Sequence, residues 1–140
     1  MEVDVNWLAV VLATVSSMVV GSIWYAKSVF GTKWQKLVKL DSKDMKSGAG
    51  RAIGITIVVS FITAYVLAHV TFLSEQFFHA GYVQSGLTTA FWMWLGFVAA
   101  RQITHDAFEQ RPWQLTAMNA VHELVTLLIM GLIIGLLPPA

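Results

Sequence analysis

The chain of 140 residues is 56% hydrophobic and only 12% charged, and its mean hydropathy is +0.66. An average soluble domain carries about 25% charged residues, so this composition excludes an ordinary soluble domain. It predicts one integral membrane domain over residues 1–140. The sequence has no cysteine, which excludes disulfides and thiolate metal sites, and its net charge of +1 argues against a nucleic-acid partner.

Four apolar stretches of about 20 residues match the thickness of a bilayer's hydrocarbon core and predict four membrane spans. They cover residues 5–25, 52–72, 85–103 and 114–137. We expect helices, because lipid cannot satisfy exposed backbone amides and these stretches are too long for barrel strands. The first stretch is expected to be retained and not cleaved as a signal peptide, because its leader is acidic. The predicted fold is an all-α, four-helix transmembrane bundle.

The basic residues predict the orientation of this bundle. All nine fall in or beside the first and third connections: Lys27, Lys33, Lys36, Lys39, Lys43, Lys46, Arg51, Arg101 and Arg111. The positive-inside rule therefore places these two connections in the cytoplasm and both termini outside.

The first connection has an amphipathic pattern. Phe30, Trp34 and Leu37 recur at helical spacing while lysines face elsewhere, which predicts a short helix lying in the membrane interface. A further helix is expected to be capped by Asp41 and to stop at Gly48–Gly50. The pattern favours a membrane anchor, with lipid or partner recognition as the alternative.

Near the middle of the fourth stretch, His122 and Glu123 stand side by side. Counted from Trp113 at about 1.5 Å per residue, Glu123 is expected roughly 15 Å deep, close to the midplane. Because no basic residue is within reach, its carboxyl is expected to face the bundle interior and to bind a proton.

Polar residues at similar depth or on the same stripe complete a candidate ligand or proton site: Glu123, His122, Asn119, Ser17, Ser60 and Thr63. The alternative is polar glue, in which His122 and Glu123 only join helices by hydrogen bonds. For His122 the alternative is favoured, since it points about 100° away from Glu123 around the helix.

Two further patterns have structural explanations beside functional ones. Gly131 and Gly135 have the spacing that lets helices approach closely, either between copies in a homo-oligomer or within one bundle. His105, Asp106 and Glu109 could converge on a metal, but a second histidine at suitable spacing is absent. A charged turn tied by local salt bridges is therefore favoured, and neither a metal nor a cofactor is predicted.

Two segments carry a resemblance to a known family: GSIWYAKSVFGTKW from Gly21 to Trp34, and FVAARQITHDAFEQRPWQL from Phe97 to Leu115. They resemble the end of the first span, and the end of the third with the start of the fourth, in a bacterial family of small four-helix membrane proteins described as a domain of unknown function. The resemblance implies a bacterial cytoplasmic membrane and transfers no activity. It also implies a shared motif on the cytoplasmic rim: Trp24, Tyr25, Phe30, Gly31, Trp34, Phe108, Glu109, Arg111 and Trp113.

Three classes of function follow from these patterns. The first is a membrane protein that binds or moves a proton, an ion or a small apolar ligand around Glu123. The second is a structural or partner-binding subunit that uses the glycine face and the basic helix. The third, an intramembrane enzyme, is not expected, because no nucleophile–base pair or metal set has useful spacing. A chain this short encloses little volume, so transport would require a dimer or larger assembly.

Overall fold

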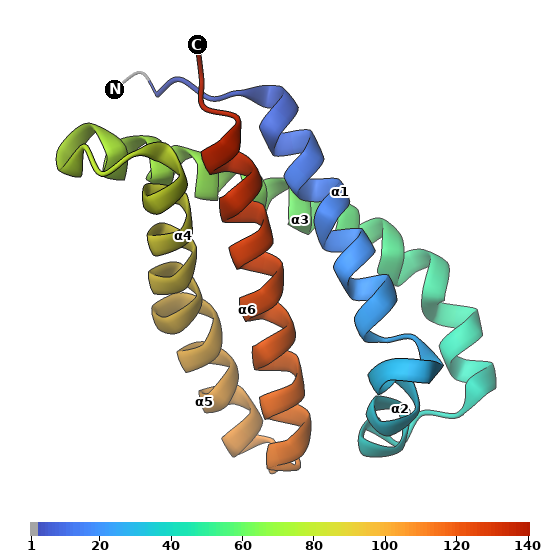
Figure 1. Cartoon of the computed structure of the whole chain (residues 1–140). Helices are drawn as coiled ribbons and strands as arrows, with labels where there is room; N and C mark the ends of the chain where they lie inside the picture. Colours follow the sequence, from blue (N-terminus) through green and yellow to red (C-terminus); the bar gives the residue numbers. More distant parts are fainter. Residues whose placement is uncertain (1–2) are drawn as a thin grey trace.

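The computed structural model describes residues 3–140, and every regular element in that range is a helix (Figure 1). The elements are α1 (Trp7–Trp24), η1 (Lys27–Gly31), α2 (Thr32–Val38), α3 (Ser42–Phe78), α4 (Tyr82–Met93), η2 (Trp94–Ala99), α5 (Ala100–Phe108) and α6 (Trp113–Leu136). In η1 and η2 the backbone is π-helical, with hydrogen bonds that span five residues instead of four. The prediction of an all-α fold is confirmed.

Three helices, α1, α3 and α6, are long and apolar enough to cross a membrane. The predicted spans 5–25 and 114–137 agree closely with α1 and α6. The predicted span 85–103 falls on α4, η2 and α5, which follow one another without a break from Tyr82 to Phe108. Because η2 divides this segment, none of its parts alone has the length of a membrane span.

The second predicted span belongs to a much longer helix. Asp41 caps α3 as expected: its carboxylate accepts hydrogen bonds from the amides of Lys43 (2.9 Å) and Asp44 (2.8 Å). The expected stop at Gly48–Gly50 is wrong, because α3 continues through it. A glycine inside a helix costs about 1 kcal/mol relative to alanine, too little to end a helix that continues on both sides.

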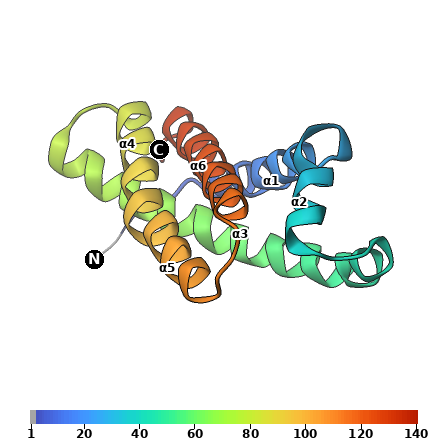
Figure 2. The ribbon, with the colours of Figure 1, turned by 90° about the horizontal axis from the view of Figure 1, so that it is seen from below.

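The 37 residues of α3 extend over roughly 55 Å, well beyond a hydrocarbon core of about 30 Å. The helix accordingly runs obliquely past α1 and α6, from the end near α2 to the end near α4 (Figures 1 and 2). This tilt separates the first half of α3 from α6.

The chain between α1 and α3 folds back on the end of α1. The amide of Gly31 donates to the carbonyl of Ala26 (2.9 Å), and a Cβ at Gly31 would collide with the carbonyl oxygen of Tyr25. Glycine is required here because no other residue allows this close approach. The expected short helix in this connection is confirmed as α2, which ends at Val38 and is followed by Lys39 in a left-handed conformation (φ 57°). Its position in a membrane interface stays a prediction.

The core lies in the half of the molecule that carries both termini. It consists of alanines and larger aliphatic side chains, with one methionine, from α1, α3, α4 and α6: Ala9, Val10, Ala13, Ala64, Leu67, Ala68, Ala90, Leu127, Met130 and Ile134. At this end Asn6 caps α1 and its amide donates to the carbonyl of Pro138 (3.3 Å), which ties the N-terminal segment to the C-terminal one (Figure 1). Towards the opposite end the helices diverge.

Gly131 and Gly135 bring α6 against α4 of the same chain. A Cβ at Gly131 would lie 2.5 Å from the carbonyl oxygen of Gly86, and a Cβ at Gly135 would lie 2.7 Å from that of Tyr82. These glycines therefore pack two helices of one bundle together, which is one of the two alternatives predicted from the sequence. A second copy could use this face only by displacing α4.

Candidate functional site

The aromatic residues at the end of α1 surround His122 of α6. The ring centroids of Trp24 and Tyr25 lie 5.8 and 5.0 Å from that of His122. The hydroxyl of Tyr25 donates a hydrogen bond to Oδ1 of Asn119 (3.0 Å), and the ring of Trp34 packs edge-on against Tyr25 (5.5 Å). From the sequence alone, the rim motif and the polar residues of α6 are two different candidate sites. The fold brings the first half of that motif, Trp24, Tyr25 and Trp34, next to the polar residues of α6.

Within α6, the imidazole of His122 lies between two polar side chains. Its Nδ1 is 3.3 Å from Oε1 of Glu123, and its Nε2 is 3.5 Å from the hydroxyl of Thr126. The two side chains leave α6 about 100° apart, and the glutamate side chain is long enough to reach the imidazole across one helical step. The Glu123 side chain is 42% exposed, so it is not enclosed in the core.

Glu123 lies level with the end of α1 and not with its middle. A Cβ at Gly21, in the last turn of α1, would be 3.7 Å from Nε2 of His122. The expected depth was counted from Trp113 on the assumption that all helices end at the same level. In the structure α6 extends past the end of α1 (Figure 1), so the depth of Glu123 counted from the start of α6 differs from its level along α1.

Two adjacent grooves meet at Glu123. An inner groove of about 460 Å³ lies between α1, α3 and α6, and an outer groove of about 890 Å³ lies between α2, α3, α5 and α6. Five residues line both grooves: Tyr25, Ala52, Ile53, Thr56 and Glu123. The two grooves therefore adjoin along these residues, beside the carboxyl of Glu123.

Of the three hydroxyl residues predicted for the site, Ser17 and Ser60 line the inner groove with Glu123. Thr63 does not: it lines a separate groove that faces η2, and its hydroxyl is bonded to the backbone of its own helix. Sequence reasoning missed Thr56, which lines both grooves. Its spacing of four residues from Ser60, which puts both on one face of α3, could have identified it.

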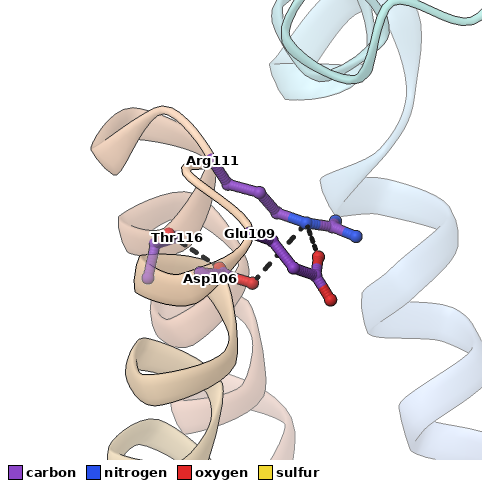
Figure 3. A network of polar contacts seen from close by, with 4 residues as sticks. All are labelled: Asp106, Glu109, Arg111 and Thr116. Carbon is purple, nitrogen blue, oxygen red and sulfur yellow. Dashed lines mark hydrogen bonds and ion pairs between the residues drawn. The ribbon is translucent and has the colours of Figure 1, made fainter.

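The other half of the rim motif forms a separate cluster at the turn between α5 and α6 (Figure 3). Asp106 is buried there and accepts a hydrogen bond from the hydroxyl of Thr116 (2.7 Å). The guanidinium Nε of Arg111 lies 3.8 Å from Oδ1 of Asp106 and pairs with the carboxylate of Glu109. These contacts hold α5 and α6 together at the turn, as expected for a charged turn joined by local salt bridges.

The remaining residues of that segment converge on no site. Phe108 and Trp113 are 87% and 73% exposed and line neither groove. His105 is exposed whereas Asp106 is buried, so these two side chains and Glu109 do not face a common point. Within residues 3–140, no group of three or more His, Cys, Asp or Glu side chains could hold a metal ion.

The comparisons with known proteins identify a family without assigning an activity. A family model described as "Protein of unknown function (DUF1761)" matches residues 8–135. No curated protein and no solved structure matches the chain.

Proposed function

The chain belongs to the DUF1761 family, and because that description names no activity, we propose from the geometry that it is a multi-pass membrane protein that binds a small ligand in the grooves beside Glu123. One observation carries the proposal. The carboxyl of Glu123 is partly exposed where two grooves adjoin, between helices that are long and apolar enough to cross a membrane.

The proposed topology has four spans, formed by α1, α3, the continuous segment from Tyr82 to Phe108, and α6. In support of this topology, the segment from Tyr82 to Phe108 is long enough to cross a membrane, since its helical rise amounts to roughly 40 Å. The termini lie at one end of the bundle, and α2, the start of α3 and the turn after α5 lie at the other (Figure 1). Because most of the lysines and arginines lie in these latter segments, the positive-inside rule places both termini outside a bacterial cytoplasmic membrane.

Binding accounts for the site better than catalysis does. His122 between Thr126 and Glu123 has the order of a nucleophile, a base and an orienting group. However, acyl transfer also needs free donors for the developing oxyanion, and the backbone amides in this part of α6 are committed to helix hydrogen bonds. We therefore propose a protein without enzymatic activity.

A structural or partner-binding subunit is the alternative, with the basic α2 as its contact surface. Homo-oligomer formation belongs to either proposal, and a transport path in a chain of this size would require it. If the protein is such a subunit, the grooves have no role, and water need not reach Glu123.

The absence of cysteine makes an accessibility test direct. We expect Thr56→Cys and Ser60→Cys, in oriented membrane vesicles, to react with small impermeant thiol reagents from the basic side. Thr63→Cys is the matched control on the same helix and should react far more slowly, because it lines a different, largely apolar groove. If neither Thr56→Cys nor Ser60→Cys reacts from that side, the groove is closed and the proposed function is wrong. Reaction of Lys39→Cys from the outer side would overturn the topology.

A further inference from the structure

Carboxyl side chains line both grooves, and the basic side chain among the described lining residues is the imidazole of His122, 3.3 Å from the Glu123 carboxyl in the inner groove. Glu123 lines both grooves, and Asp44 lines the outer one near the start of α3. Among the described residues that line them, none is a lysine or arginine, although the chain carries nine such residues and all of them were predicted at this end. The lysines and arginines of the chain thus lie outside the lining of these grooves.

The walls of the outer groove are aromatic where it approaches Glu123. Tyr25 and Trp34 both line it, with their ring centroids 5.5 Å apart. Aromatic faces attract organic cations through the quadrupole of the ring, and carboxylates attract them by charge. Aliphatic side chains such as Leu40, Ile53 and Val98 also line it, which suits an apolar body attached to the charge.

The dimensions of the grooves favour an organic molecule over a bare ion. Their volumes, about 460 and 890 Å³, lie within the range of roughly 300–1,000 Å³ typical of small-molecule sites. A metal ion needs several oxygen ligands around one point. Asp44 lines only the outer groove while Glu123 stands at the junction of the two, so these carboxylates do not provide such a point.

We propose that the grooves bind a small organic cation with an apolar body, whose positive group lies between the carboxylate of Glu123 and the rings of Tyr25 and Trp34. This inference rests on the proposed function, because it names the class of ligand for the same site. The polar side chains Asn119 and Gln102, which also line the outer groove, can accept hydrogen bonds from an ammonium group.

The test compares two probes of the same shape and opposite charge, tetraphenylphosphonium and tetraphenylborate, with the purified full chain in lipid nanodiscs. We expect saturable binding of the phosphonium, followed by quenching of tryptophan fluorescence, and no saturable binding of the borate. Glu123→Gln keeps the shape and removes the charge, so it should weaken phosphonium binding at least about tenfold. Glu109→Gln is the control, because Glu109 is exposed at the same end and lines neither groove.

A second measurement keeps the result interpretable if Glu123→Gln does not fold. The phosphonium should protect Thr56→Cys from thiol modification in a chain that retains Glu123, and the borate should not. Equal protection by both probes, or phosphonium binding that is unchanged in folded Glu123→Gln, would overturn the cation proposal. If Thr56→Cys reacts and neither probe protects it, the cation proposal is wrong, although the groove is open. Unreactive cysteines would instead refute the proposed function itself.

Discussion

Replacing Gly131 by alanine should separate α6 from α4 and destabilise the chain. The added Cβ would stand 2.5 Å from the carbonyl oxygen of Gly86, whereas ordinary van der Waals contact begins near 3.4 Å. The neighbour is backbone and cannot rotate away, so the helices must move apart by roughly an ångström or bend, and overpacking of this kind costs about 1–3 kcal/mol. The free energy of unfolding, measured by SDS titration in mixed micelles, should fall by that amount.

Gly54→Ala is the matched control, because a Cβ at Gly54 of α3 would meet nothing within 4 Å. This change should be neutral or should stabilise the chain by up to about 1 kcal/mol, since alanine favours the helix over glycine. If Gly131→Ala unfolds like the wild type but shifts a dimer towards monomer, the glycine face joins two copies. In that case Gly131 would pack against a second copy and not against α4 of its own chain.

One further result is expected. Asp41→Ala removes the side chain that caps α3 and should lower the free energy of unfolding by about 1 kcal/mol; an unchanged value in the same SDS titration would mean that the first turn contributes nothing.

The polar site could be predicted only in part from the sequence. Glu123 could be identified because it is an ionisable residue in an apolar stretch, where burial of a carboxyl is costly wherever the segment packs. Its depth and neighbours could not be predicted in the same way. They depend on how far α6 extends past α1 and on the turn at Gly31, which carries Trp34 back towards Tyr25. Each is set by contacts between residues far apart in the chain.

The sequence by itself determined the features that depend on neighbouring residues. Apolar blocks of helical length predicted α1 and α6 almost to the residue, and a side chain suited to capping predicted the start of α3 at Asp41. Only the tertiary structure decided that Gly131 packs on Gly86, and that the aromatic end of α1 meets His122 and Glu123. The physical reason is that local hydrogen bonding and hydropathy fix where a helix forms, whereas the tilt and offset of helices depend on how their side chains fit together.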